Sequence, residues 1–154
     1  MAQADNPGVI VLPPVLYGIA FAVVFALHWS WPLPVLSYPA SLWAGIAALS
    51  LGAALAAWGF LSLKKAGTNI LPTQPTTALV ASGPFRLSRN PIYIAISLVF
   101  LGLSFMVNSL WGVIALVPLS VVMHYGVILR EERYLEKKFG ENYRRYRSTV
   151  RRYL

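Results

Sequence analysis

The chain has 154 residues, of which 57% are hydrophobic and only 12% are charged, and it carries a formal net charge of +8. Soluble domains average about 25% charged residues, so this composition indicates a membrane protein with room for one domain, residues 1–154. The sequence contains no cysteine, which excludes disulfide bonds, thiolate metal sites and a cysteine nucleophile.

Four apolar segments are long enough to be membrane spans. A helix of about 20 apolar residues crosses a bilayer, and the sequence predicts spans at residues 9–31, 40–63, 91–107 and 109–129. A tight turn at Asn108-Ser109 joins the last two spans. The predicted fold class is therefore all-α, an integral membrane bundle of four transmembrane helices followed by a tail, residues 130–154.

The basic residues predict the orientation of this bundle. With four spans, both termini and the 64–90 loop lie on one side, and all 13 Lys and Arg residues fall there. The positive-inside rule makes that side cytoplasmic, which places the protein in the cell inner membrane with cytoplasmic N- and C-termini. The second span carries a stripe of small residues, Ala48, Gly52 and Ala56, which predicts either close packing within the bundle or a homodimer.

The tail is expected to form a basic amphipathic helix. After a stop at Gly140, the residues Tyr143, Tyr146, Val150 and Tyr153 recur at helical spacing, with arginines on the other faces. Such a helix lies in the headgroup plane of an anionic leaflet. Nucleic acid is not expected as a partner, because the basic residues flank membrane spans.

The segment Gly-Pro-Phe-Arg-Leu-Ser-Arg-Asn-Pro-Ile-Tyr, residues 83–93, precedes the third span. Asn90 suits the N-cap and Pro91 the first helical position. A helix start also presents free N–H groups and a positive dipole end, which favour an anion. The structural alternative is that Asn90 only caps the helix while the arginines contact lipid phosphates.

An acidic pair is expected to approach this helix start. Glu131 and Glu132 follow the fourth span, and the tight turn makes the third and fourth spans antiparallel neighbours. Anion-binding, cation-binding and aromatic groups then share one small volume, which suits a zwitterion with a ring system. In the alternative interpretation the glutamates only pair with nearby arginines. His28 and His124 have no acidic partners in their spans, and no metal site is expected.

Two motifs resemble those of the isoprenylcysteine carboxyl methyltransferase and phospholipid methyltransferase superfamily. Residues 83–93 resemble its G-P-Y-R-x-x-R-H-P-x-Y segment, and Glu131-Glu132 with the following tail resembles its E-E-x-x-L-x-x-x-F-G-x-x-Y pattern. The resemblance implies S-adenosylmethionine as cofactor and a lipidic or amphiphilic methyl acceptor. By position, it implies cofactor contacts from Thr77, Ala78, Leu79, Val80, Phe85, Asn90, Pro91, Ile92, Tyr93 and Glu131.

Further expectations follow from the chemistry of methyl transfer and from two positions at which this sequence departs from the family pattern. An amine acceptor must lose a proton, for which Glu132 is the candidate base, and Arg89 or Arg86 is expected to orient an acidic acceptor. Asn90 replaces the motif's His and cannot titrate. Val127 stands where prenylcysteine enzymes have a substrate-binding Arg, so a prenylcysteine is not expected as substrate. The alternatives are a non-catalytic four-helix protein, such as a small transporter or scaffold, and a membrane reductase.

Overall fold

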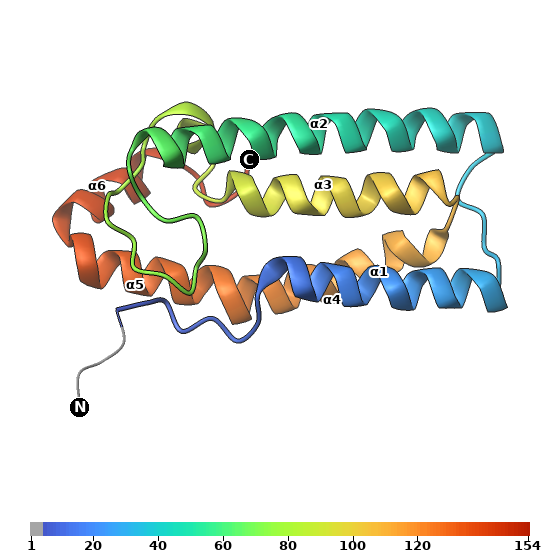
Figure 1. Ribbon diagram of the computed structural model, residues 1–154, viewed down its shortest axis with the longest axis horizontal. Helices are drawn as coiled ribbons and strands as arrows, with labels where there is room; N and C mark the ends of the chain where they lie inside the picture. The colour runs from blue at the N-terminus through green and yellow to red at the C-terminus, as the bar shows by residue number, and fades with distance from the viewer. Residues whose placement is uncertain (1–4) are drawn as a thin grey trace.

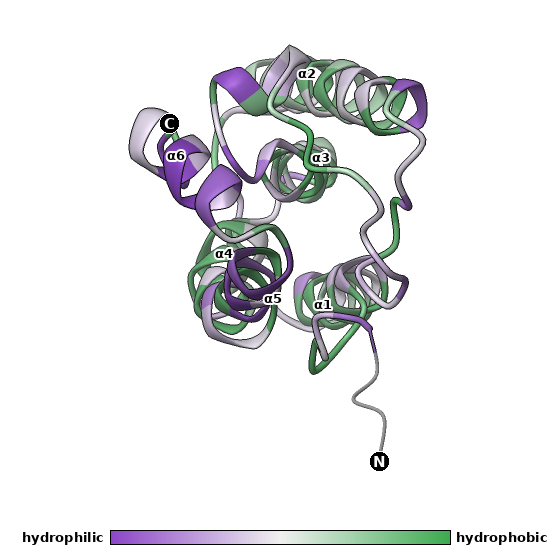
Figure 2. Ribbon diagram, turned by 90° about the vertical axis from the view of Figure 1, so that its left-hand side faces the viewer, coloured by the Kyte–Doolittle hydropathy of each residue, from purple (hydrophilic) through white to green (hydrophobic). Residues whose placement is uncertain are grey.

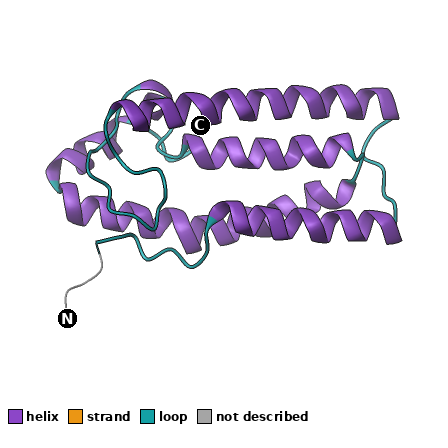
Figure 3. Ribbon diagram, viewed as in Figure 1, coloured by secondary structure: helices purple, strands orange, loops and turns teal. Residues whose placement is uncertain are grey.

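The computed structural model describes residues 5–154, and every regular element in that range is a helix (Figure 3). Apolar helices lie side by side along the long axis, and shorter polar helices cap one end (Figure 1). The elements are α1 (Pro13–Ser30), α2 (Tyr38–Lys65), η1 (Gly83–Arg86), α3 (Pro91–Met106), α4 (Leu110–Met123), the π-helical turn η2 (His124–Ile128), α5 (Leu129–Phe139) and α6 (Glu141–Thr149).

Three of the helices are long and apolar enough to cross a membrane. They are α1, α2 and the continuous helix from α4 through η2 into α5, Leu110–Phe139. The helix α3 has 16 residues, about 24 Å at the α-helical rise, which is shorter than the roughly 30 Å hydrocarbon core. The all-α class is thus confirmed, and three helices could cross a membrane by length and composition, whereas a crossing by α3 stays a prediction.

Glycines on α2 let α3 approach its backbone closely. Gly45, Gly52 and Gly59 recur every seven residues and are buried. A Cβ added at Gly52 would lie 2.9 Å from the carbonyl oxygen of Ala95, and one at Gly102 would lie 2.7 Å from the backbone nitrogen of Leu49. The small residues of the second span are therefore used for packing inside the chain.

The polar groups collect at one end of the bundle. That end carries the 66–90 loop, the N-terminal segment, α5 and α6, and Figure 2 shows the hydrophilic residues concentrated there. At the other end the connections are short. Asn108, at φ +51°, accepts hydrogen bonds from the backbone N–H groups of Val35 and Leu36 at 3.0 and 3.2 Å, which ties the two connections together.

The C-terminal tail differs from its prediction. The helix α6 ends at Thr149, and Val150 is extended, so the expected stripe does not continue to Tyr153. Tyr143 and Tyr146 are buried in the protein, and the Tyr146 hydroxyl donates to the Phe85 carbonyl at 2.7 Å. The tyrosines thus fix the tail onto the segment before α3 because that segment offers them a hydrogen-bond acceptor and an apolar surface.

Candidate functional site

The long loop between α2 and α3 is closed on itself by threonines. Buried Thr68 accepts hydrogen bonds from the N–H groups of Thr77 and Ala78 at 3.0 and 3.4 Å. The Thr77 hydroxyl donates to the Gly67 carbonyl at 2.9 Å, and the N–H of Thr76 reaches the Tyr134 hydroxyl at 3.1 Å. These bonds hold residues 78–80 against the polar end of the bundle.

The start of α3 has the predicted backbone arrangement but a different use of its amide. Asn90 is the N-cap residue and Pro91 begins the helix, yet the Asn90 side chain makes no capping hydrogen bond. Its Nδ2 donates instead to the carbonyl of Arg152 at 3.0 Å, to which Ser88 Oγ also donates at 3.1 Å. The expectation that the Asn90 side chain caps α3 is therefore wrong, because the docked tail orients that amide so that its Nδ2 donates to the Arg152 carbonyl.

The acidic pair divides between two environments. Successive helical residues point about 100° apart, and Glu131 and Glu132 face different partners. The buried Glu132 carboxylate is 2.9 Å from Arg89 and 2.8 Å from Arg152. Glu131 instead accepts a hydrogen bond from the Tyr93 side chain. The sequence predicts both glutamates at this end of the bundle. In the structure Glu132 forms ion pairs, whereas Glu131 accepts a hydrogen bond from a tyrosine.

Glu131 lies in the charged stretch beyond the apolar part of the helix, which ends at Leu129. Burial raises the pKa of the Glu131 carboxyl from its ordinary value of 4.5 to about 7. The hydrogen bond from Tyr93 opposes this shift and the nearby charge of Glu132 adds to it. A carboxyl group that is desolvated and only weakly compensated favours a cationic ligand, because such a ligand would stabilise its ionised form.

A cavity of about 380 Å³ lies in front of Glu131. It is enclosed by the starts of α1 and α3, the end of α2, the 66–90 loop and α5. Its lining is largely apolar and aromatic, with a few polar groups, which is the usual character of a small-molecule site. The wall is formed by Pro7, Pro13, Pro14, Ala56, Phe60, Leu63, Thr68, Asn69, Ile70, Leu71, Pro72, Thr76, Ala78, Leu79, Val80, Phe85, Arg89, Asn90, Pro91, Ile92, Tyr93, Ile96, Val99, Glu131, Tyr134, Leu135 and Tyr146.

The predicted site residues fall on this wall with two exceptions. Of the residues expected at the cofactor, Ala78, Leu79, Val80, Phe85, Asn90, Pro91, Ile92, Tyr93 and Glu131 line the cavity, as does Arg89. Thr77 does not line it, and its hydrogen bonds instead shape the loop. Glu132 does not line it either, since its carboxylate is held by two guanidinium groups.

Other wall residues were not anticipated. Tyr134 and Leu135 follow Glu131 by three and four residues, so helical periodicity carried the signal that they share its face. Phe60 and Pro13 come from helices whose positions relative to α3 no local pattern reveals. Within residues 5–154, no group of three or more His, Cys, Asp or Glu side chains is placed to hold a metal ion.

These observations define the class of the protein. It is an all-helical, membrane-type bundle with a mixed polar and aromatic cavity at its basic end. The sequence model of the phospholipid methyltransferase family matches residues 40–142, about two thirds of the chain. The protein belongs to this family, as its two motifs indicated. The match extends over α2, further toward the N-terminus than the motifs alone.

Two curated relatives share parts of the sequence. An uncharacterized protein of Haemophilus influenzae is 35% identical over 63 residues, which is 41% of this chain and the whole of that protein. The cobalt-zinc-cadmium resistance protein CzcN of Cupriavidus metallidurans is 41% identical over 64 residues, 41% of this chain and 29% of that protein. No solved structure matches the chain.

Proposed function

We propose that this protein is an S-adenosylmethionine-dependent methyltransferase that acts on a membrane-embedded or amphiphilic acceptor. The observation that carries the proposal is Glu131, a half-buried carboxylate without an ion-pair partner among the described residues, on the wall of the cavity at the start of α3. Membership of the phospholipid methyltransferase family supports the same activity. The structural alternative, that the glutamates only form ion pairs, accounts for Glu132 and not for Glu131.

The groups on the wall suit the chemistry of this cofactor. Glu131 offers a carboxylate for its amino group. Arg89 has a buried Nε without a hydrogen-bond partner among the described residues. This guanidinium group is suited to the carboxylate of the cofactor. Phe60, Phe85 and Leu79 provide apolar and aromatic surface for an adenine ring. The cavity volume lies within the roughly 300–1,000 Å³ typical of small-molecule sites.

The bound cofactor would supply a methyl group activated by a sulfonium sulfur, and the protein would supply positioning. Glu131 and Arg89 would fix the two ends of the amino-acid portion, and the apolar wall would exclude water. Glu132 is a weaker candidate for a base than the sequence indicated, since both its oxygens bond guanidinium groups. We assign it instead to positioning Arg89.

The depth of the cavity within the bundle supports a lipidic acceptor that would enter from the bilayer. The cavity wall includes Ala56 and Val99, each about two helical turns below the polar end of its helix, and Pro13 at the start of α1. All 13 Lys and Arg residues lie in segments that collect at the cavity end. By the positive-inside rule the cavity would face the cytoplasm, next to the anionic leaflet of the cell inner membrane.

Topology has a direct test, because the chain has no native cysteine. Single cysteines introduced at residues 5 and 154 are expected to react with an impermeant maleimide from the cytoplasmic side only. Labelling of the two positions from opposite sides would refute four spans. Chemical cross-linking in the same vesicles would test the homodimer, which remains a proposal.

The function is tested by calorimetry with S-adenosylmethionine on protein purified in nanodiscs. We expect saturable binding, followed by transfer of radiolabelled methyl to an amphiphilic acceptor in a screen that includes aminophospholipids and a farnesylcysteine analogue. Absence of cofactor binding would refute the enzyme and would favour a transporter or scaffold. Binding of a nicotinamide dinucleotide in its place would favour the reductase alternative.

A further inference from the structure

A second cavity lies on the other side of α3. Its volume is about 540 Å³, and it is lined by Tyr17, Tyr93, Ile94, Ser97, Leu98, Leu101, Leu116, Ser120, Val121, Met123, His124, Tyr125, Ile128 and Tyr153. Tyr93 belongs to the walls of both cavities. The second cavity is therefore a direct neighbour of the candidate cofactor site.

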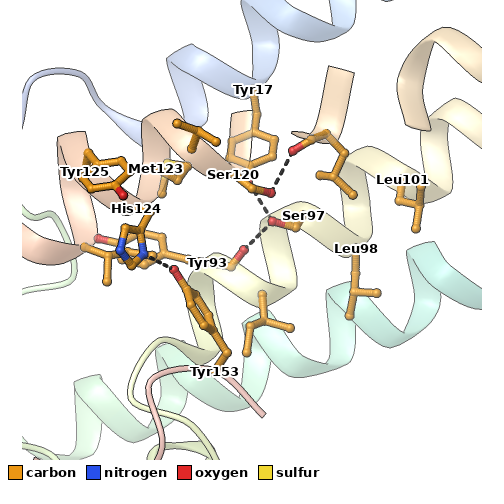
Figure 4. Close-up of a pocket in the computed structure, with 14 residues that line it drawn as sticks. Tyr17, Tyr93, Ser97, Leu98, Leu101, Ser120, Met123, His124, Tyr125 and Tyr153 are labelled. Atoms are coloured by element: carbon orange, nitrogen blue, oxygen red, sulfur yellow. Dashed lines mark hydrogen bonds between the residues drawn. The ribbon is translucent and has the colours of Figure 1, made fainter. Parts of the chain in front are cut away.

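Hydrogen-bonding groups gather at one end of this cavity. Figure 4 shows His124, Tyr125, Tyr93 and Tyr153 clustered there. The His124 ring nitrogen Nδ1 and the Tyr153 hydroxyl are 2.7 Å apart. The other ring nitrogen, Nε2, has no hydrogen-bond partner among the described residues. In the middle of the cavity, by contrast, the Tyr17 and Ser97 hydroxyls satisfy each other at 2.7 Å.

The rest of the cavity is an apolar slot between antiparallel helices. On α3, Leu101 follows Tyr93 by eight residues, and on α4, Leu116 precedes His124 by eight. Eight residues rise about 12 Å along a helix. Both walls thus run from the polar cluster at the cytoplasmic end down into the depth of the bilayer. A cavity of this shape fits a ligand with a polar head group and one apolar chain.

The polar cluster depends on the π-helical turn. The turn η2 begins at His124, and π-helical turns inside α-helices are frequent at functional sites. Here His124, Tyr125 and Ile128 all face the same cavity. The turn is held from outside by the N–H of Ile10, which donates to the Gly126 carbonyl at 3.2 Å.

The lining contains no Lys, Arg, Asp or Glu. The hydrogen-bonding groups at its polar end are tyrosine hydroxyls and the His124 imidazole, which suit an uncharged hydroxyl head group. We propose that this cavity binds the methyl acceptor, a single-chain amphiphile whose hydroxyl head forms a hydrogen bond with His124 while its chain lies between α3 and α4. The assignment rests on the proposed methyltransferase function, since it places that acceptor beside Tyr93 at the wall shared with the cofactor cavity.

Photolabelling in nanodiscs without cofactor tests this site. The probes are a fatty alcohol and a fatty acid of equal chain length, each with a diazirine in the chain. We expect the alcohol to label peptides of α3 and α4 around Leu101 and Leu116, and an excess of the unlabelled alcohol to compete. The fatty acid is expected to label them several-fold less. Equal labelling by both probes would identify an unspecific lipid groove and overturn the proposal.

Variants identify the contacts. Ser120→Trp should fill the exposed rim of the cavity and abolish labelling, whereas Val117→Trp, on the same helix but outside the lining, should not change it. His124→Phe should lower alcohol labelling roughly five-fold, the loss of one neutral hydrogen bond, and remove the preference over the acid. Retained labelling in Ser120→Trp, or a retained preference in His124→Phe, would overturn the assignment.

Cofactor calorimetry on the same variants separates the two proposals. Both Trp variants should bind S-adenosylmethionine like the unmodified protein, which also shows that they fold. If the cofactor binds and the alcohol does not label this cavity, the acceptor site is wrong and the methyltransferase function stands. If the alcohol labels specifically and no cofactor binds, the function fails, and the assignment of the occupant as a methyl acceptor fails with it.

Discussion

Replacing Glu131 by Gln removes one negative charge from the candidate cofactor cavity and leaves its shape nearly unchanged. A hydrogen bond that involves a charged group contributes about 1.5–3 kcal/mol, so S-adenosylmethionine should bind roughly ten- to a hundred-fold more weakly. Glu136→Gln is the matched control. Glu136 lies on the same helix, pairs with Arg147 at 3.1 Å and does not line the cavity.

The pH dependence of binding gives a second, independent readout. With the pKa of Glu131 raised to about 7, the carboxyl is largely protonated at pH 6 and must lose its proton to receive an ammonium group. Affinity should therefore fall as pH decreases below 7, by about ten-fold per unit well below the pKa. The Gln variant should lose this dependence, because its amide does not titrate.

The stability of the protein without cofactor should change in the opposite sense. Between pH 4.5 and 7 the folded Glu131 binds more protons than the unfolded one, so stability falls as pH rises through this window and levels off above it. A shift from 4.5 to about 7 corresponds to about 3 kcal/mol. Glu131→Gln should thus raise the thermal midpoint of the cofactor-free protein at pH 8 while it weakens cofactor binding.

The assays are isothermal calorimetry between pH 6 and 8 and thermal unfolding in detergent. An unchanged dissociation constant in Glu131→Gln would refute the role of this residue. A pH dependence that persists in the variant would show that another group titrates. If the Glu136→Gln control weakens binding as much, the effect is a general one of charge near the site.

Three further predictions concern packing. Arg152→Ala leaves the buried Glu132 with one cation, and it should cost about 1.5–3 kcal/mol, seen as a lower unfolding midpoint; an unchanged midpoint would show that the tail does not hold the site. Gly102→Ala should destabilise by about 1–3 kcal/mol, because its Cβ would meet the α2 backbone at 2.7 Å. Gly18→Ala, in α1 with open space around it, should instead stabilise by about 0.5–1 kcal/mol; equal effects in the same assay would contradict the close approach. Val127→Arg should fail to fold on size-exclusion chromatography, because the structure buries Val127 completely in the apolar core, and a folded, cofactor-binding variant would refute that placement.

The position of Val127 bears on the substrate. In the family that the motifs resemble, prenylcysteine enzymes have a substrate-binding Arg at this position. In the structure Val127 packs against a cluster that includes Tyr17, Val24 and Phe100, where an unpaired guanidinium would be very costly. The position belongs to the core of the bundle in this chain, and the preference against a prenylcysteine stays a prediction.

The sequence by itself predicted the helices and the end of the bundle at which the candidate site lies. Apolar runs long enough to span a bilayer predict helices wherever they occur, because lipid cannot satisfy open backbone groups. A tight turn after Val107 forces α3 and α4 to be antiparallel, so the segment before α3 and the acidic pair after α4 had to meet. The small residues of α2 likewise carried the signal of a close helix contact.

Only the tertiary structure decided which groups face the cavity. Glu131 and Glu132 are chemically identical neighbours, and the choice between them depends on Arg89 and Arg152, which reach Glu132 from distant parts of the chain. The hydrogen-bond acceptor of the Asn90 side chain likewise follows only from the tertiary structure, because it is the carbonyl of Arg152 in the docked tail. Local patterns record periodicity and composition, whereas such long-range pairings depend on how the helices pack, and this packing distributes the charges between structural ion pairs and the cavity.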